Sequence, residues 1–456
     1  MEAMKVQAPL DQSFEPIYRG LRAFDEQARA AGGPEIRIAL ERNDGLVATH
    51  DMRVLPEGVN DVLNLRMAER MVKSMLWVYG GFRVTIAGSK AVYEGVKEQY
   101  REGGARAFDA HFMAHVYEHD FEVLYAATVA EAPRRKDASA PVGRHLDGCR
   151  IGFDAGGSDR KVSAVVNGES VYSEEVVWFP KTNSDPSYHF DGIVTAMKTA
   201  AAHMPRVDAI GVSSAGVYIN NQTMNASLFL KVGEDDYEKY VKDIYIRAAK
   251  EIGDVPLTVC NDGDVTALAG AMSLNEDGIL GIAMGTSEAG GYVDRQGNIT
   301  GWLNELAFVP CDLAESAMMD EWSGDIGCGV KYFSQDAVIK LAPAAGIALD
   351  ECLSPAEKLK VVQGEVEKGN RNAEAIYETI GVYLGYTLAF YSLFYDINHV
   401  LLMGRVTSGK GGDLVLRKAQ QVLREEYPEM GMHVNLPDEK SRRVGQSVAA
   451  ASLPKI

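Results

Sequence analysis

The sequence contains little cysteine, and its cysteines are not spaced as pairs. Five cysteines are scattered over 456 residues, and no two of them form a Cys-x-x-Cys pair. This spacing supports neither a disulfide framework nor a closed zinc site, so we expect reduced thiols. The N-terminal segment carries acids and prolines where a signal peptide has an apolar run. The sequence therefore predicts a cytoplasmic protein.

Excess positive charge and long hydrophobic runs are also missing. The chain has 46 Lys and Arg against 64 Asp and Glu, a formal net charge of −18. Proteins that bind nucleic acid or anionic membranes need basic surface, so we expect neither partner. The most apolar stretch, residues 384–403, is interrupted by Asp396, Asn398 and His399, which predicts a buried helix and strand rather than a membrane span. We therefore expect a protein that acts on a small molecule rather than one that binds nucleic acid or a membrane.

What is present is an ordinary globular composition with alternating strand and helix patterns. Hydrophobic residues make up 46% of the chain, and the length predicts about two to three domains. Strands and helices alternate over residues 36–133, and the segment 131–148, rich in proline and charge, is typical of a linker. Two later segments, 149–179 and 278–301, each contain an apolar strand, a glycine turn and a second strand. These patterns predict an α/β fold.

Each of the two glycine turns follows an apolar strand and suits a phosphate group. Glycine lets the backbone approach a polyanion, amides and hydroxyls donate hydrogen bonds, and a carboxylate at the strand end can hold Mg²⁺. The carboxylate is Asp154, and the turn residues are Gly156, Gly157 and Ser158 in the first turn and Gly285, Thr286 and Ser287 in the second. The alternative is a plain turn in each place, because glycine and aspartate are common turn formers. Two turns of the same design support a phosphate-binding site more strongly than one turn does.

Asn261 and Asp262 lie where an apolar strand ends and a helix begins. A carboxylate at this junction, in a partly desolvated cleft, can accept the proton of an attacking hydroxyl, while Asn261 orients the substrate. The alternative is a structural one, in which Asp262 or Asp264 is the N-cap of the helix. The local sequence alone favours the cap.

Taken together, these segments resemble the ROK (repressor, open reading frame, kinase) sugar kinases of the actin/hexokinase/Hsp70 superfamily. The matching segments are DAGGS at 154–158, ND at 261–262 and GTSEAGG at 285–291. The segment around Asn225 resembles the one that closes over the sugar, and the turn with Gly404 resembles the adenosine side. The resemblance covers roughly residues 150–456.

The resemblance implies an α/β, actin-like ATPase fold with two RNase H-like lobes and a central cleft. Residues 149–272 would be the first lobe, completed by a C-terminal helix at about 440–456, and residues 273–440 the second lobe. Residues 1–148 would be an N-terminal α/β extension domain of unknown role. ROK sugar kinases of this kind imply a homodimer.

The implied function is ATP-dependent phosphorylation of a hydroxyl on a sugar or sugar derivative. ATP with Mg²⁺ would lie between the lobes, with Asp154 near the metal and Gly404 near the adenosine, and the six turn residues named above would surround the phosphates. Asp262 would be the general base. Asn225, Asn261, Asp262 and Glu305 would bind the sugar.

The sequence departs from the family pattern beside the sugar site. The family motif Gly-Glu-x-Gly-His appears as residues 304–308, which keep Glu305 but replace the histidine by Phe308. Where the family has a cysteine-rich zinc site, this chain keeps Cys328 but has Ser323, and one thiol cannot make a tetrahedral site, so we expect no zinc. Val330 stands near the position of a family glutamate. We therefore expect a sugar kinase other than a standard glucokinase.

Two alternatives remain open. The departures at Phe308 and Val330 are also consistent with a catalytically silent protein that binds sugar or nucleotide. The family further includes transcriptional regulators with an N-terminal winged helix-turn-helix, although residues 1–150 here offer hairpins and no basic stripe.

Overall fold

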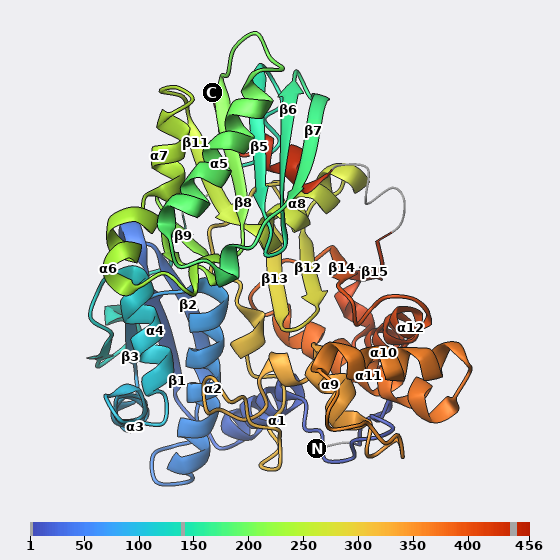
Figure 1. The fold of residues 1–456 in the computed structure, drawn as a ribbon. Helices are drawn as coiled ribbons and strands as arrows, with labels where there is room; N and C mark the ends of the chain where they lie inside the picture. The colour runs from blue at the N-terminus through green and yellow to red at the C-terminus, as the bar shows by residue number, and fades with distance from the viewer. Residues whose placement is uncertain (1–2, 138–141, 438–444) are drawn as a thin grey trace.

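The chain builds three main sheets whose helices lie around them. The computed structural model describes residues 3–137, 142–437 and 445–456. In Figure 1 a five-stranded sheet lies at the top, a C-terminal four-stranded sheet lies below it, and an N-terminal four-stranded sheet lies at the lower left. Within the described ranges no helix is both long and apolar enough to cross a membrane. The mixed α/β architecture confirms the class expected from the sequence.

The N-terminal sheet has the strand order β2-β1-β3-β4. Its strands are β1 (Glu35–Glu41), β2 (Val47–Arg53), β3 (Arg83–Ala87) and β4 (Glu122–Ala126). Its helices are α1 (Ile17–Ala30), α2 (Asp61–Tyr79), α3 (Lys90–Tyr100) and α4 (Ala107–Tyr117). The predicted hairpin joins β1 to β2, and the turn needs the positive φ angles of Asp44 (60°) and Gly45 (62°). Helices α2 to α4 and strands β1 to β4 follow the alternation of strand and helix expected over residues 36–133.

The five-stranded sheet has the order β11-β8-β5-β6-β7. Its strands are β5 (Cys149–Ala155), β6 (Asp159–Val166), β7 (Glu169–Val177), β8 (Ala209–Ser214) and β11 (Leu257–Asn261). Strands β5, β8 and β11 run parallel, so the carboxyl ends of β5 and β11, where Asp154 and Asn261 lie, face the same edge. The helices of this region are α5 (Pro186–Ala201), α6 (Glu234–Asp236), α7 (Ile244–Lys250) and α13 (Gln446–Ala451). A small hairpin of β9 (Val217–Ile219) and β10 (Gln222–Asn225) follows β8.

The C-terminal four-stranded sheet has the order β13-β12-β14-β15. Its strands are β12 (Ile279–Met284), β13 (Glu288–Val293), β14 (His399–Met403) and β15 (His433–Asn435). Its helices are α8 (Asp262–Leu274), α9 (Gln335–Leu341), α10 (Pro355–Glu367), α11 (Arg371–Tyr391) and α12 (Lys410–Glu426). The apolar stretch 384–403 is a buried helix end and strand, as expected.

One helix packs unusually closely on each of the last two sheets. On the five-stranded sheet, a Cβ at Gly211 would lie 1.7 Å from the Ala450 carbonyl oxygen of α13. On the C-terminal sheet, a Cβ at Gly291 would lie 2.0 Å from the Gly263 carbonyl oxygen of α8. Both strand positions therefore require glycine. Helix α13 thus returns to the first of these sheets, and the boundary expected near residue 440 lies outside the described residues.

The N-terminal region shares its core with the C-terminal half of the chain. One hydrophobic cluster includes Phe14 and Trp77 together with side chains of α11 and α12. The backbone is joined as well, because the Glu305 N–H donates to the Trp77 carbonyl oxygen (2.9 Å) and the Ile17 N–H donates to that of Cys311 (3.1 Å). The N-terminal sheet is therefore packed into the molecule rather than tethered to it.

Candidate active site

Asp154 lies at the carboxyl end of β5 and is almost completely buried. Its Oδ1 accepts a hydrogen bond from the Ser213 hydroxyl (2.9 Å). Gln446 of α13 donates to the Ser213 hydroxyl oxygen (2.9 Å) and to the Asp262 carbonyl oxygen (3.1 Å), so three elements are linked here. Burial raises the pKa of Asp154 to about 6, and the nearby charge of Asp262 adds to the effect. This carboxyl group would gain from a cation beside it.

The first glycine turn joins β5 to β6 directly after Asp154. The Trp178 indole N–H donates to the Gly156 carbonyl oxygen (2.7 Å) and holds the turn in place. A Cβ at Gly157 would lie 2.8 Å from Cε of Lys181, so glycine makes room for this lysine over the turn. The Ser158 hydroxyl donates to the carboxylate of Asp159 (2.9 Å). A cation and a backbone turn without side chains suit a phosphate group.

Asp262 is the first residue of α8. The structure corrects the expectation that Asp262 or Asp264 caps this helix, because the N-cap is Asn261, whose side-chain oxygen accepts from the Gly263 N–H (2.7 Å). Asp264 is instead buried and accepts from the Tyr292 N–H (3.0 Å). Burial raises the pKa of Asp262, partly opposed by its hydrogen bond from the Gly263 N–H. The capping role of Asn261 leaves the neighbouring carboxylate free to serve as a base.

A cavity of about 410 Å³ brings the expected sugar-binding residues together. Its lining includes Asn225, Asn261, Asp262 and Glu305. Ser287, the last residue of the second glycine turn, lines the same cavity. These residues come from β10, the β11–α8 junction, the β12–β13 turn and the segment after β13, so four separate parts of the chain meet around Asp262.

Two carboxyl groups besides that of Asp262 belong to the lining of this cavity. Glu288 of β13 lines it and is only 2% exposed, and burial raises its pKa to about 8. Burial likewise raises the pKa of Glu305 to about 7, with added repulsion from Asp262 and Asp264. The sequence was interpreted as a glycine turn at this point, and the role of Glu288 in the lining was missed. Its position in an otherwise small and apolar strand is the signal that could have found it.

One wall of the cavity is aromatic and comes partly from the N-terminal region. Phe308, at the position of the family histidine, lines the cavity and stacks on Trp77 of α2, with ring centroids 4.2 Å apart. Phe112 of α4 also lines the cavity and contacts Trp77 (4.8 Å). Residues of the N-terminal sheet region therefore complete the wall, which the sequence did not reveal.

A second, larger cavity of about 750 Å³ is lined by residues of α8, of β14 and of the segment that follows β14. Its lining includes Gly404, Thr266 and Gln446. Gly404 has a φ of +96°, and a Cβ there would lie 2.3 Å from the Met284 carbonyl oxygen, so the chain passes close to the second glycine turn. Gly285 N–H donates to the Ser287 carbonyl oxygen within that turn (2.9 Å). Gly285 and Thr286 are not among the described residues that line either cavity.

The residues present fit the expected ATP and Mg²⁺. The second cavity is large enough for a nucleoside, since ligand sites commonly measure several hundred Å³. Asp154 supplies a carboxylate beside a turn that contains Gly156 and Gly157, and carboxylate oxygen is a ligand that Mg²⁺ prefers. Gln446 touches both the Ser213–Asp154 pair and the start of α8, and so lies between the two cavities.

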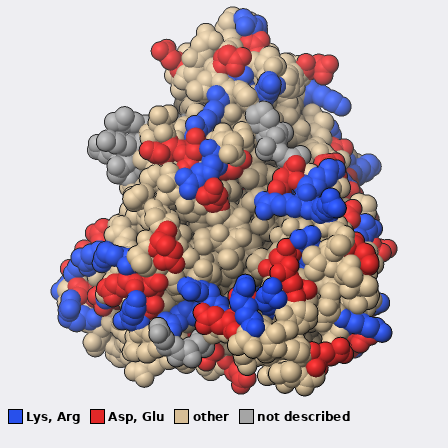
Figure 2. All heavy atoms as spheres, turned by 180° about the vertical axis from the view of Figure 1, so that it is seen from behind, with Lys and Arg blue, Asp and Glu red and all other residues tan. Residues whose placement is uncertain are grey.

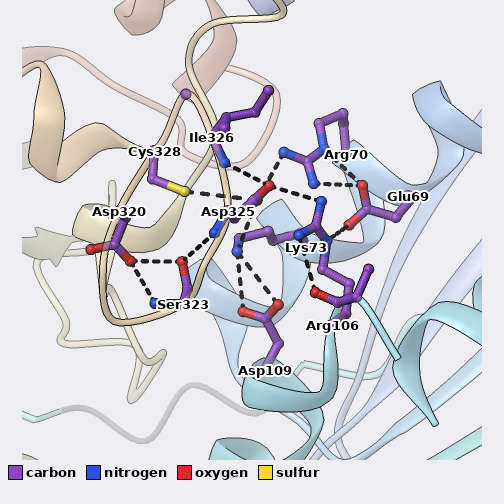
Figure 3. Close-up of polar contacts among 12 residues, drawn as sticks. Glu69, Arg70, Lys73, Arg106, Asp109, Asp320, Ser323, Asp325, Ile326 and Cys328 are labelled. Atoms are coloured by element: carbon purple, nitrogen blue, oxygen red, sulfur yellow. Dashed lines mark hydrogen bonds and ion pairs between the residues drawn. The ribbon is translucent and has the colours of Figure 1, made fainter. Parts of the chain in front are cut away.

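Buried charges hold the loop that carries Ser323, Asp325 and Cys328 (Figure 3). Asp325 of this loop accepts from Arg70 (2.9 Å), pairs with Lys73 (3.0 Å) and pairs with Arg106 (2.8 Å). Glu69 and Asp109 supply the remaining negative charge, so three cations face three anions. Burial works against the ionised form, but the three cations hold the pKa of Asp325 well below its usual range.

Cys328 stands at the edge of this cluster, with its sulfur 3.8 Å from the Asp325 carboxylate. Ser323, where a zinc ligand is expected in the family, donates to Asp320 (2.6 Å). In the described ranges, no three His, Cys, Asp or Glu side chains are gathered so as to hold a metal ion. The loop is thus tied to α2 and α4 by salt bridges.

Charges of both signs are interspersed on the face of the molecule shown in Figure 2. Lysine and arginine lie next to aspartate and glutamate there, without a continuous basic stripe. A nucleic-acid-binding face needs such a stripe.

Comparison with solved structures places the fold. The ROK hexokinase from Thermus thermophilus superposes with a TM-score of 0.51 and 18% sequence identity, over 66% of this chain and 97% of the hexokinase. A ROK family glucokinase from Streptomyces griseus, solved with glucose and AMPPNP, gives a TM-score of 0.46 and 20% identity over 67% of this chain and 99% of its own. A ROK family transcriptional regulator, described as a homologue of the E. coli MLC protein, gives a TM-score of 0.49 and 17% sequence identity, over 68% of this chain and 79% of the regulator.

No protein-family model matches the sequence, and no curated protein matches it either. The fold itself is nevertheless clear from the hexokinase, which is matched over nearly its whole length. Over about two thirds of its length, this chain has the fold of the ROK family kinases.

Proposed function

We propose that the protein transfers the γ-phosphate of ATP to a hydroxyl group of a sugar or sugar derivative. The observation that carries the proposal is that Asp262 shares one cavity with Asn225, Asn261 and Glu305, while its carbonyl oxygen is linked through Gln446 to the Asp154 site. In this proposal Asp262 is the base, Asn225, Asn261 and Glu305 hold the alcohol, and the turn after Asp154 holds the phosphate. Phosphoryl transfer requires little more than this positioning and charge neutralisation.

In the proposed reaction the acceptor hydroxyl lies in the cavity of about 410 Å³. Asp262 accepts the hydroxyl proton while the oxygen forms its bond to the γ-phosphorus, and the bond from that phosphorus to the bridging oxygen of ADP breaks. Asn225 and Glu305 orient the acceptor. A Mg²⁺ ion, when held by Asp154, would neutralise charge on the phosphates. Burial raises the pKa of Asp262, which makes it a stronger base than a solvated aspartate.

The proposal is tested by replacing the base with an isosteric amide. Asp262→Asn removes the proton acceptor, so we expect the rate of sugar-dependent ADP release to fall by at least about 100-fold. Binding of ATP, measured by calorimetry, should stay within about twofold of the original. Equal rates in the two proteins would remove Asp262 as the base. ATP and sugar binding without any turnover would favour a silent binding protein.

The architecture around this reaction is part of the same proposal. The five-stranded and C-terminal sheets would be the two RNase H-like lobes of an actin-like ATPase fold, with residues 1–148 as an extension that walls the acceptor cavity. Phe308 in place of a histidine favours an acceptor other than that of a standard glucokinase. In this proposal the enzyme acts in the cytoplasm and is a homodimer. Sedimentation of the purified chain would test the oligomeric state.

A further inference from the structure

The acceptor cavity has an acidic lining. Asp262, Glu288 and Glu305 all line it. Among the described residues that line it, none is lysine, arginine or histidine. Without a cation beside them, buried carboxyl groups retain their protons, and the pKa values of Glu288 and Glu305 are raised accordingly. A cationic ligand would supply the missing counter-charge and let these groups ionise.

Glu288 is the most informative of these side chains. It is 2% exposed, and its Oε1 is 3.4 Å from the Tyr391 hydroxyl, a long contact. Its Oε2 has no hydrogen-bond partner among the described residues. The backbone packs tightly behind it, because a Cβ at Gly329 would lie 2.3 Å from this oxygen. This unpaired oxygen lies within the wall of the cavity, and a donor group on the ligand would satisfy it once the carboxyl group turns toward the cavity.

The aromatic wall favours the same kind of donor. Phe112 and Phe308 also line the cavity, and both rings contact Trp77. The faces of aromatic rings attract ammonium groups and also pack against the apolar face of a sugar ring. An ammonium group has three N–H donors for the surrounding carboxylates. A carboxylate or phosphate on the acceptor would instead be repelled.

We propose that the acceptor of this enzyme carries an ammonium group, as a free amino sugar does, and that Glu288 and Glu305 recognise that group. This inference rests on the proposed function, since it concerns the acceptor of the same reaction. Glu288 acts as a specificity residue: it binds the amine, while Asp262 accepts the proton of a different group, the hydroxyl. Acetylation of the amine would remove its charge and with it the recognition.

The test compares three sets of sugars with the full-length protein and MgATP. The sets are free amino sugars with the amine at different ring positions, the matching N-acetyl sugars and the parent hydroxy sugars. We expect kcat/KM for at least one amino sugar to exceed that of its two counterparts by about tenfold or more. Glu288→Gln should reduce this advantage by about tenfold, mainly through KM. Glu102→Gln, an exposed change of the same type, should leave it unaltered.

Calorimetry without nucleotide separates failure of this inference from failure of the proposed function. If no sugar is phosphorylated but an amino sugar binds at least about tenfold more tightly than its counterparts, and less so in Glu288→Gln, the inference stands and the kinase proposal fails. If neutral sugars are bound or phosphorylated with the same efficiency as amino sugars, or if Glu288→Gln leaves the ratio between them unchanged, the inference is overturned. The kinase proposal survives that outcome when any of these sugars is phosphorylated.

Discussion

At the scale of single residues, the carboxyl groups around the acceptor cavity couple folding to pH. Burial raises the pKa of Glu288 to about 8 and that of Glu305 to about 7. Between the ordinary pKa of glutamate and these values, the folded protein keeps a proton that the unfolded chain has lost. Stability is therefore lost as the pH rises through this window, and it levels off above pH 8.

Glu288→Gln should weaken this pH dependence, because an amide cannot ionise. Between about pH 5 and 8.5, the free energy of unfolding of the original protein should fall by about 2–4 kcal/mol relative to that of the variant. Chemical denaturation at several pH values measures the difference. Glu102→Gln, at an exposed position, should follow the original protein. Parallel curves for the Glu288 variant would show that this carboxyl ionises freely in the folded state.

At the scale of elements, the loop that carries Asp325 depends on α2 and α4 through buried charges. Arg70, Lys73 and Arg106 all pair with Asp325, and the Lys73 side chain is completely buried. The cluster is balanced, so the removal of one charge leaves the others buried and uncompensated. Breaking such a pair costs far more than the pair contributes against apolar residues of the same shape.

Asp325→Asn should therefore lower the free energy of unfolding by about 3–5 kcal/mol. Glu98→Gln breaks an exposed ion pair with Arg101 and should change the free energy of unfolding far less. Urea denaturation of both variants gives the comparison. A loss below about 1 kcal/mol for Asp325→Asn would mean that water or movement of the loop neutralises the remaining cations.

Local patterns in the sequence predicted many of these elements, because the patterns that matter act over a few residues. The Asn167–Gly168 pair, a common hairpin-turn sequence, joins β6 to β7 with φ angles of 49° and 87°. The junction at Asp262 was also placed correctly between a strand and a helix. The cap was assigned to the wrong residue, since Asn261 and Asp264 are equally good candidates in the sequence and only tertiary contacts bury Asp264.

Contacts between distant parts of the chain could not be predicted in the same way. Phe112 and Glu288 line one cavity although they are far apart in the sequence, and no local pattern encodes their approach. The buried charge cluster likewise joins α2 to the Asp325 loop across more than half of the chain. The polar groups on each turn could therefore be predicted from the sequence, but the residues that form the wall around them could not.

At the scale of the whole molecule, the N-terminal region and the C-terminal half form one packed body. Phe14 lies within a hydrophobic cluster that extends through α11 and α12, and its ring contacts Tyr383 (4.6 Å). The backbone hydrogen bond from Glu305 to Trp77 passes directly behind the acceptor cavity. A disturbance at this junction should therefore reach both the stability of the fold and the shape of the site.

Trp77 is the side chain on which this dependence can be measured. It is fully buried, stacks on Phe308 and donates its indole N–H to Asp109 (2.6 Å). Trp77→Ala should lower the free energy of unfolding by about 3–5 kcal/mol. It should also raise the KM for the acceptor more than that for ATP, because Phe308 loses its support while the second cavity is untouched.

The matched control is Trp322→Ala, since Trp322 is 77% exposed and its loss should change stability by less than about 0.5 kcal/mol. Thermal and chemical unfolding of both variants, followed by kinetics with the best acceptor, completes the measurement. If Trp77→Ala destabilised the fold but altered both KM values equally, the N-terminal region would support the molecule as a whole without shaping the acceptor site. A selective rise in the acceptor KM would instead show that this region forms part of the site, because only the wall behind Phe308 distinguishes the two substrates.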